Sequence, residues 1–277
     1  MTVPDEKIIT FRIRRFDPES DSAPHWESYA VSVFEGMTVL EALHKIKEEQ
    51  APTLAWRSSC RMGVCGSCGM FVNQFPQLAC QTQVLHLRSD TISIEPLPNY
   101  PNVKDLVPDL QPLFEKHTQV KPFIIRLDDV KEMENPSGEF LQTPEEREAF
   151  SQFTYCIKCG LCLAACPTVA TDPRFLGPQA LTQAYRYSAD NRDSGVSNRL
   201  DSVDAFHGAY QCHMAGACSH ACPKGVDPAL AIQLLKRALV LDHFGFGKKE
   251  SQTAKVLPLA DVVKELEAFA PPPRTVK

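Results

Sequence analysis

The stretch CIKCGLCLAACP, from Cys156 to Pro167, decides the fold of the C-terminal half of this chain. Its spacing, C-x2-C-x2-C-x3-C-P, is the run that holds iron–sulfur clusters in bacterial proteins. A second stretch, CHMAGACSHACP from Cys212 to Pro223, repeats this spacing with Ala215 in place of one cysteine. The two runs together predict a pair of iron–sulfur clusters, held at turns between helices.

The pairing of the two runs predicts which cysteines share a cluster. In two-cluster ferredoxins the fourth cysteine of each run binds the cluster of the other run. One cluster, predicted as 4Fe-4S, is therefore held by four cysteines: Cys156, Cys159, Cys162 and Cys222. The other cluster has three cysteine ligands: Cys166, Cys212 and Cys218.

Ala215 stands where the second cluster would take its fourth thiolate. Three thiolates leave one corner of a cubane unheld, so the expected product is a 3Fe-4S cluster. The alternative is a 4Fe-4S cluster whose fourth ligand is water or another side chain. His213 and Met214 are the side chains able to donate within this run, and they leave the alternative open.

Four earlier cysteines have a different spacing, C-x4-C-x2-C followed by a more distant fourth: Cys60, Cys65, Cys68 and Cys80. This spacing is typical of a plant-type 2Fe-2S cluster. Glycines in the loop, such as Gly63 and Gly66, allow backbone conformations that wrap closely around inorganic sulfide. The three predicted sites use all eleven cysteines. Zinc is the main alternative metal. Structural zinc sites are held by a set of four ligands, and the consecutive C-x2-C steps of the two runs are not typical of such sites.

The N-terminal third has the pattern of a small α+β domain. Apolar residues alternate with polar ones at 9–13 and 29–33, which predicts two half-buried strands. Thr38 begins a helix with a capping box. Later strands are expected at 71–72 and 91–94. This order of strands, helix and cysteine loop predicts a β-grasp fold like that of plant-type 2Fe-2S ferredoxins.

Four prolines crowd the stretch 96–108 and predict a linker, because proline at this density breaks regular structure. We place the domain boundary there, with a 2Fe-2S domain at 1–105 and a second domain at 106–277. A helix start with proline at its first position follows at Thr143. The second domain is expected to be all-α, of the bacterial-ferredoxin-like kind called the α-helical ferredoxin fold, with the 4Fe-4S and 3Fe-4S clusters.

Composition excludes several classes of function. The net charge is −5 and the basic residues are scattered, whereas a nucleic-acid surface needs a clustered basic patch. The chain opens without the features of a secretory signal, and its many cysteines suit metal binding in a reducing cytoplasm. No segment reaches the roughly 20 apolar residues that cross a bilayer. If the protein works at a membrane, a partner must anchor it.

The chain lacks the parts of a complete enzyme. It contains no G-x-G-x-x-G motif after a predicted strand, no P-loop and no Ser/His/Asp constellation. We therefore expect no catalytic residues in this chain and assign the substrate chemistry to a partner.

Several segments resemble the iron–sulfur subunit of succinate dehydrogenase and fumarate reductase, the succinate:quinone oxidoreductase family. They are spread over nearly the whole chain: 57–69, 156–167, 175–178, 185–187, 191–193 and 212–228. Related subunits of other oxidoreductases share the helical cluster runs but not this whole order.

The resemblance implies a membrane-bound complex. A flavoprotein partner carries covalent FAD and the dicarboxylate site, and membrane-anchor subunits, often with haem b, help to bind quinone. Electrons would pass from flavin through the 2Fe-2S, 4Fe-4S and 3Fe-4S clusters to quinone during succinate oxidation, and in reverse during fumarate reduction. The chain would lie peripherally on the cytoplasmic face of the inner or plasma membrane, held by the anchor subunits.

The family's quinone pocket lies beside the 3Fe-4S cluster, and four positions of this chain match residues at or near it: Pro167, Thr168, His213 and Lys236. Many succinate-oxidising members carry a tryptophan where this chain has Thr171. Fumarate reductases often lack this tryptophan, and residues 160–165 also resemble the sequences of fumarate reductases. His213, in contrast, resembles the residue found in the succinate-oxidising members. The resemblance leaves the direction of catalysis and the quinone type open.

Three other hypotheses are weighed for the cysteine runs. A free-standing multi-cluster ferredoxin would be a soluble monomer, whereas a subunit would co-purify with a flavoprotein and a membrane fraction. An iron–sulfur subunit of a different quinone- or disulfide-linked oxidoreductase would form a complex whose clusters succinate does not reduce. A zinc-binding structural protein would be colourless.

Overall fold

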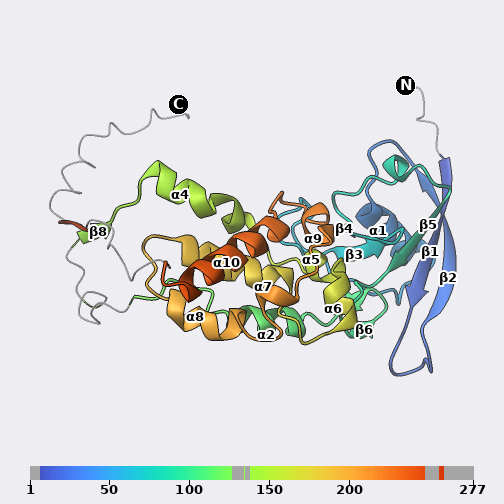
Figure 1. Ribbon diagram of the computed structural model, residues 1–277. Helices are drawn as coiled ribbons and strands as arrows, with labels where there is room; N and C mark the ends of the chain where they lie inside the picture. Colours follow the sequence, from blue (N-terminus) through green and yellow to red (C-terminus); the bar gives the residue numbers. More distant parts are fainter. Residues whose placement is uncertain (1–6, 127–133, 135–137, 247–255, 259–277) are drawn as a thin grey trace, which may run out of the picture.

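The computed structural model describes residues 7–126, 134, 138–246 and 256–258 of the 277-residue chain. The described part has a sheet-rich N-terminal half and a helical C-terminal half, which lie at opposite ends of an elongated molecule (Figure 1). The N-terminal elements, in chain order, are β1 (Lys7–Arg15), β2 (His25–Val33), α1 (Val39–Glu49), β3 (Gly69–Val72), β4 (Phe75–Leu78), η1 (Leu85–Leu87) and β5 (Thr91–Glu95).

The N-terminal half is built on a five-stranded mixed sheet with the order β2-β1-β5-β3-β4. β1 pairs antiparallel with β2 and parallel with β5, and β3 pairs antiparallel with β4 and β5. Every second residue of β1 from Ile9 to Ile13 is buried, because alternate side chains of a strand point to the same face. The buried stripe of α1, which includes Leu40, Leu43 and Ile46, belongs to the same core.

The predicted strands at 9–13, 29–33, 71–72 and 91–94 all fall within strands of this sheet and are confirmed. The predicted capping box is also confirmed, since the Thr38 side chain accepts a hydrogen bond from the backbone N–H of Glu41. The sequence does not predict β4, because this short strand contains Pro76. The turn that folds β4 back onto β3 uses Asn73 and Gln74, both with left-handed backbone (φ 48° and 64°).

The rest of the described chain contains two short strand pairs and a set of helices. The elements before the first cysteine run are β6 (Asn102–Lys104), β7 (Val107–Pro108), α2 (Gln111–Gln119), β8 (Gly138–Phe140), α4 (Pro144–Ser151) and η2 (Gln152–Tyr155). The later elements are α5 (Leu161–Ala164), α6 (Pro167–Thr171), α7 (Gly177–Ala189), α8 (Val196–Val203), η3 (Ala209–Gln211), α9 (Ala217–His220), α10 (Pro228–His243) and β9 (Val256–Pro258).

The strands β7, β8 and β9 are a departure from the all-α prediction for residues 106–277. β7 pairs with β6, which precedes the predicted boundary, and β8 pairs with β9. These strands are two or three residues long, too short to display the alternation by which a strand is recognised in a sequence. The helices nevertheless dominate this half, and within the described residues none combines the length and apolar character needed to cross a membrane.

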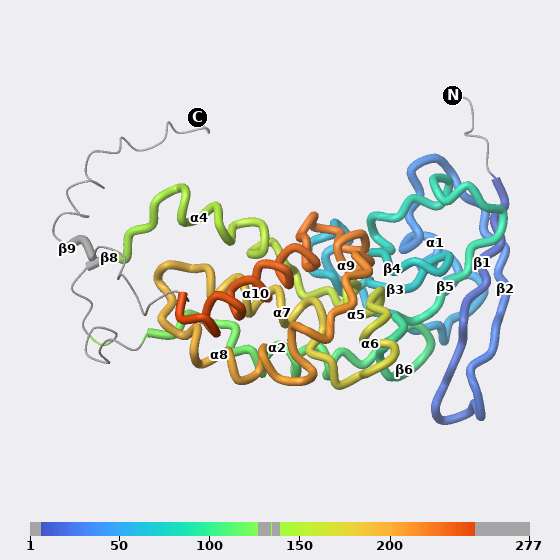
Figure 2. The backbone as a smooth tube through the Cα atoms, in the orientation of Figure 1, coloured from blue at the N-terminus to red at the C-terminus, as the bar shows by residue number. Residues whose placement is uncertain are grey.

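α7 is the central helix of the C-terminal half. It packs against α2, α4, α8 and α10, and Figure 2 shows its tube between those of α10 and α2. Leu181 and Ala184 of α7 share a buried cluster with Ile232 and Leu235 of α10. The predicted helix start at Thr143 is confirmed as the capping box of α4. α7 packs against α5 of the first cysteine run, and α10 packs against α9 of the second.

A buried ion pair and its hydrogen bonds hold helix α8 against the segment that follows α2. Both charged side chains are almost fully buried, and Arg199 Nη1 lies 2.6 Å from Asp193 Oδ1. Arg199 also donates to the backbone carbonyls of Lys121 and Phe123. The Asp193 carboxylate in turn accepts from the backbone N–H of Ile125. Because each charge is paired and hydrogen-bonded, its burial is compensated.

The two halves are joined by hydrogen bonds from the proline-rich linker. The Asn99 amide donates to the carbonyls of Leu163 and Cys166 at 2.8 and 3.2 Å, and the Tyr100 hydroxyl donates to that of Gly160 at 3.0 Å. Leu161 of the helical half is part of the N-terminal hydrophobic core. The linker therefore holds the first cysteine run against the sheet domain.

Candidate metal centres

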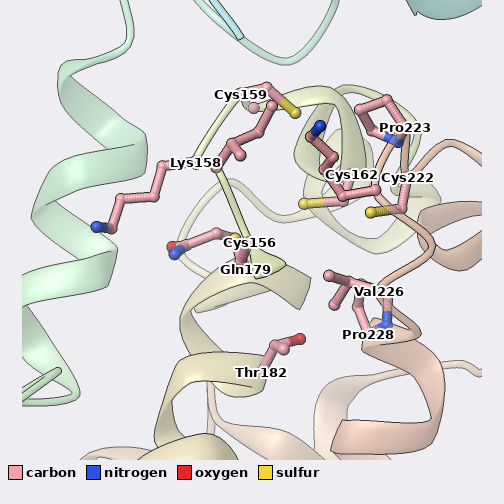
Figure 3. A pocket seen from close by; sticks show the side chains of 13 residues that line it. Cys156, Lys158, Cys159, Cys162, Gln179, Thr182, Cys222, Pro223, Val226 and Pro228 are labelled. Atoms are coloured by element: carbon pink, nitrogen blue, oxygen red, sulfur yellow. The ribbon is translucent and has the colours of Figure 1, made fainter. Parts of the chain in front are cut away.

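A cavity in the helical half is lined by cysteines from both runs. The four cysteines are Cys156, Cys159, Cys162 and Cys222. Figure 3 shows their side chains around this first cavity, three from the first run and one from the second. These are the thiols that the crossed pairing of the two runs predicts for the 4Fe-4S cluster.

A second cavity is lined by the other three cysteines of the helical half: Cys166, Cys212 and Cys218. Ala215 lines the same cavity and brings no donor atom to it. Met214 also lines this cavity, and its Sδ lies 3.7 Å from Cys212 Sγ. His213 is exposed, and it is not among the residues that line this cavity. The second cavity therefore brings together the three thiols predicted for the 3Fe-4S cluster.

The crossed arrangement follows from the repeated backbone geometry of the two runs. Lys158 and Gly160 of the first run have left-handed backbone (φ 54° and 84°), and Met214 and Gly216 of the second run do the same (φ 58° and 72°). Each of these glycines caps a four-residue helix, α5 or α9. Because α5 and α9 pack against each other, the last cysteine of each run reaches the cavity of the other.

The N-terminal cysteine loop is organised by its own backbone N–H groups. Those of Val64 and Cys65 donate to Cys60 Sγ, each at 3.3 Å, and that of Gly63 donates to Cys80 Sγ at 3.2 Å. Gly63 has a φ of 70°, which glycine adopts without strain. Such donors stabilise thiolate charge and tune a bound cluster. A hydrogen bond from Ser67 also lowers the pKa of Cys65 to about 6.

Burial opposes the ionisation of the thiols in the helical half, so thiolates there need a compensating positive charge. Burial raises the pKa of Cys159 to about 12 and that of Cys218 to about 11. The thiolate is the form that binds iron, so iron must supply the positive charge that these apolar surroundings lack. All eleven cysteines are free thiols. Within the described residues, no three His, Cys, Asp or Glu side chains are arranged to hold a single metal ion.

The N-terminal loop lies directly against the first cavity. A Cβ atom on Gly66 would lie 2.6 Å from Cys159 Cβ and 2.9 Å from Cys159 Cα. One on Gly69 would lie 3.1 Å from Leu161 Cδ2. Gly66 follows Cys65, and its φ of 73° is also left-handed. Glycine at this position therefore lets the two cysteine-bearing segments approach to backbone contact.

Gly66→Ala is expected to disturb this contact. The new methyl group would clash with the backbone of Cys159, and left-handed alanine adds strain, so the total destabilisation should be about 2 to 5 kcal/mol. Gly36→Ala is the matched control, because Gly36 has a φ of 86° and no atom within 4 Å of a new Cβ. Thermal unfolding and iron content of both variants test the prediction. Equal losses in the two variants would mean that the loop contact is unimportant.

The four quinone-site candidates lie at or near the second cavity. Pro167 and Thr168 line it, and Thr168 is buried. Lys236 on α10 donates from Nζ to the Cys212 carbonyl at 3.1 Å. His213 lies next to Cys212 on an exposed turn. The structure thus gathers Pro167, Thr168 and Lys236 around the second run and leaves His213 on the surface beside it.

Some residues at these centres carry no signal in the sequence. Asn99 and Tyr100 fall in the proline-rich linker, and only the tertiary structure reveals their bonds to the first run. Gln179 lines the first cavity, although it belongs to neither cysteine run. The helix start at Gly177–Pro178 could have indicated that Gln179 lies in a first helical turn, but not that it faces a cavity.

Comparisons with known proteins identify a 2Fe-2S and a 4Fe-4S domain in this chain. A family model of 2Fe-2S iron–sulfur cluster binding domains matches residues 10–115, and one of 4Fe-4S dicluster domains matches residues 152–226. The fumarate reductase iron–sulfur subunit of Mycobacterium tuberculosis is 45% identical over 228 residues, which cover 82% of this chain and 91% of that protein. The succinate dehydrogenase iron–sulfur subunit of Paracoccus denitrificans is 40% identical over 235 residues, which cover 84% and 88%.

The fold is also similar to that of a solved structure. A chain of the Mycobacterium smegmatis Sdh1 complex in the apo form superposes with a TM-score of 0.75 and 25% sequence identity. The similarity covers 86% of this chain and 97% of that chain, so it includes both halves of the molecule.

Proposed function

This chain belongs to the family of iron–sulfur subunits of succinate dehydrogenase and fumarate reductase, and we propose on that premise that it carries electrons between the FAD of a flavoprotein partner and a quinone at membrane-anchor subunits. It is an electron-transfer subunit of an oxidoreductase complex. Its 2Fe-2S and 4Fe-4S domains favour iron–sulfur clusters over zinc as the metal of the cysteine runs.

One observation carries the proposal: the three candidate centres adjoin one another. Gly66, next to Cys65 of the N-terminal loop, lies against Cys159 of the first cavity. Helix α5, which carries Cys162 of the first cavity, packs against helix α9, which carries Cys218 of the second. When bound, the clusters supply one-electron carriers, and adjoining carriers suit transfer along the length of the chain.

The residues of this chain fix the spacing of the centres. Asn99 and Tyr100 tie the linker to the carbonyls of the first run. Leu161 and Ala164 of α5 are buried in the N-terminal core. These contacts hold the sheet domain and the first cysteine run in one fixed arrangement. Two domains joined only by a flexible linker would not keep the distance between the centres constant.

We assign the ligands of the clusters from the crossed pairing. The 2Fe-2S ligands are Cys60, Cys65, Cys68 and Cys80, and the 4Fe-4S ligands are Cys156, Cys159, Cys162 and Cys222. A 3Fe-4S cluster takes Cys166, Cys212 and Cys218. Two facts support this third cluster: Ala215 brings no donor to the second cavity, and His213 is exposed and outside its lining.

We assign the quinone end of the chain to the surface around the second cavity. Pro167 and Thr168 line that cavity, and the ammonium of Lys236 is held by the carbonyl of Cys212. His213 is exposed on the adjoining turn and is free to reach a ligand or an anchor subunit. In this proposal the complex lies on the cytoplasmic face of the membrane, with FAD, and haem b where present, in the partner subunits.

We retain a domain boundary near residue 105 and the fold names β-grasp and α-helical ferredoxin for the two halves. Leu106 belongs to the hydrophobic core of the sheet domain, and Leu113 of α2 belongs to that of the helical half. The change of core between these two leucines supports a boundary in this part of the linker.

Purification of the tagged subunit from its native membrane fraction tests the proposal. We expect it to co-purify with a flavoprotein that carries FAD and with an anchor subunit, and we expect succinate to reduce its iron–sulfur clusters. A soluble, monomeric protein would favour a free-standing ferredoxin. A complex whose clusters ignore succinate would favour a different oxidoreductase.

A further inference from the structure

Lys116 is a buried lysine on α2. Only 9% of it is exposed to solvent, although lysine is almost never buried to this extent unless it is paired. Its ammonium donates from Nζ to the carbonyl of Pro173 at 2.5 Å and also to that of Phe175. Both carbonyls belong to the turn between α6 and α7, so the lysine side chain links α2 to this turn.

The turn that holds Lys116 adjoins the second cavity. Phe175, whose carbonyl accepts a hydrogen bond from the ammonium, lines this cavity together with the three predicted 3Fe-4S ligands. Leu113, one turn before Lys116 on α2, shares a buried hydrophobic cluster with Cys166 and Phe175. The ammonium is therefore hydrogen-bonded directly to a residue of the cavity lining.

The described residues do not balance the charge of this ammonium. Its two acceptors are backbone carbonyls, which carry only partial charge. Asp172 lies in the same turn, but its carboxylate contacts other side chains, those of Arg174, His207 and Gln211. Burial lowers the pKa of Lys116, and the charge of Asp172 opposes this fall only in part. A buried cation without a full counter-charge is costly.

We propose that the Lys116 ammonium is a fixed positive charge beside the 3Fe-4S cluster and raises the reduction potential of this cluster. The inference rests on the ligand assignment of the proposed function. A cluster with three thiolate ligands carries net negative charge and gains a further negative charge on reduction. In buried surroundings of low effective dielectric constant, a nearby cation stabilises the more negative, reduced state. The cluster in turn supplies the counter-charge that Lys116 lacks.

A purely structural role for Lys116 leads to a different expectation. As a link between α2 and the turn, Lys116 would contribute to folding stability, and its loss would lower the unfolding temperature without changing the potential of one cluster. An electrostatic role depends on the charge of the side chain and weakens with distance. The midpoint potentials of the three clusters therefore separate the two roles.

Lys116→Met tests the proposal, because methionine keeps most of the length and the apolar stem of the side chain and removes its charge. The readout is the midpoint potential of each cluster in the purified complex, measured by EPR-monitored redox titration. We expect the ratio of reduced to oxidised 3Fe-4S cluster at a fixed potential to fall about tenfold, which for one electron is a downward shift of ~59 mV. The 2Fe-2S midpoint should not move, because the N-terminal loop lies against the first cavity.

Lys121→Met is the matched control. Lys121 follows α2 and donates from Nζ to the carbonyl of Asn198 at 2.9 Å, so it too is an ammonium held by a backbone carbonyl. Asn198 lies on α8, whereas the helices that line the second cavity are α6, α7, α9 and α10. This control should leave the 3Fe-4S midpoint unchanged. An unchanged midpoint in Lys116→Met, or an equal shift in Lys121→Met, would overturn the inference.

Two further variants cover the case in which Lys116→Met does not assemble its cluster. Lys116→Arg keeps the positive charge, and its 3Fe-4S midpoint should stay close to that of the unmodified complex. Lys116→Gln keeps a hydrogen-bond donor without the charge, and should lower the midpoint as methionine does. Equal shifts in these two variants, or loss of the cluster in all three, would assign Lys116 to packing and overturn the proposal. Absence of an oxidised 3Fe-4S signal from the unmodified complex would instead overturn the ligand assignment of the proposed function.

Discussion

Replacing Cys166 with serine is expected to abolish the EPR signal of the 3Fe-4S cluster and to leave the 4Fe-4S cluster in place. Cys166 belongs to the first run by sequence, yet it lines the second cavity with Cys212 and Cys218. The other three cysteines of the first run line the first cavity. Loss of one of only three thiolates should prevent assembly of the 3Fe-4S cluster, so electron transfer to quinone should fall below detection.

Cys222→Ser is the mirror experiment. Cys222 belongs to the second run but lines the first cavity, so this variant should lose the 4Fe-4S signal and keep the oxidised 3Fe-4S signal. EPR of both purified complexes at low temperature, with iron content as a second measure, gives the comparison. Loss of the 4Fe-4S signal in Cys166→Ser would contradict the crossed assignment. Loss of both signals in both variants would show that the two clusters assemble as a unit.

Ala215→Cys is expected to convert the 3Fe-4S cluster toward a 4Fe-4S cluster of lower potential. Ala215 lines the second cavity at the position that carries a cysteine in the first run, and a thiolate there can hold a fourth iron. A fourth electron-rich thiolate favours the oxidised cluster, which lowers its potential. Reduction of quinone should fall at least about tenfold, the change in equilibrium that a shift of ~59 mV produces for one electron.

The control for this substitution is Ala215→Val. Valine is close to cysteine in size but cannot bind iron, and Ala215 is exposed enough to accept it. This variant should keep the 3Fe-4S signal and most of the quinone activity. Mössbauer and EPR spectra of the two variants distinguish conversion from steric damage. A persistent 3Fe-4S cluster in Ala215→Cys would mean that the backbone of the turn, and not the missing thiol, excludes the fourth iron.

Local patterns in the sequence predict much of this structure. The cysteine spacings, together with the crossed pairing of two-cluster ferredoxins, predict the two groups of thiols that the cavities bring together. The strands at 9–13 and 91–94 and the capping box at Thr38 are also local, and the structure confirms them. By contrast, β8 and β9 pair across more than a hundred residues and are too short to show a pattern.

The contacts around and between the centres could not be predicted from local patterns. Gln179 meets His117 only because α2 packs on α7. The approach of Gly66 to Cys159 depends on how the sheet domain docks on the first run. Glycines at 63, 66 and 69 suggest a loop that wraps closely around a cluster. The sequence does not show that this loop also packs against Cys159, because that contact depends on the tertiary fold.

The most direct test of the central claim is low-temperature EPR of the anaerobically purified complex, as isolated and after addition of succinate. We expect an oxidised 3Fe-4S signal before addition, which succinate removes while a reduced 2Fe-2S signal appears. A 3Fe-4S signal that succinate leaves unchanged would contradict the assignment to a succinate:quinone oxidoreductase. Absence of any 3Fe-4S signal would contradict the role given to Ala215.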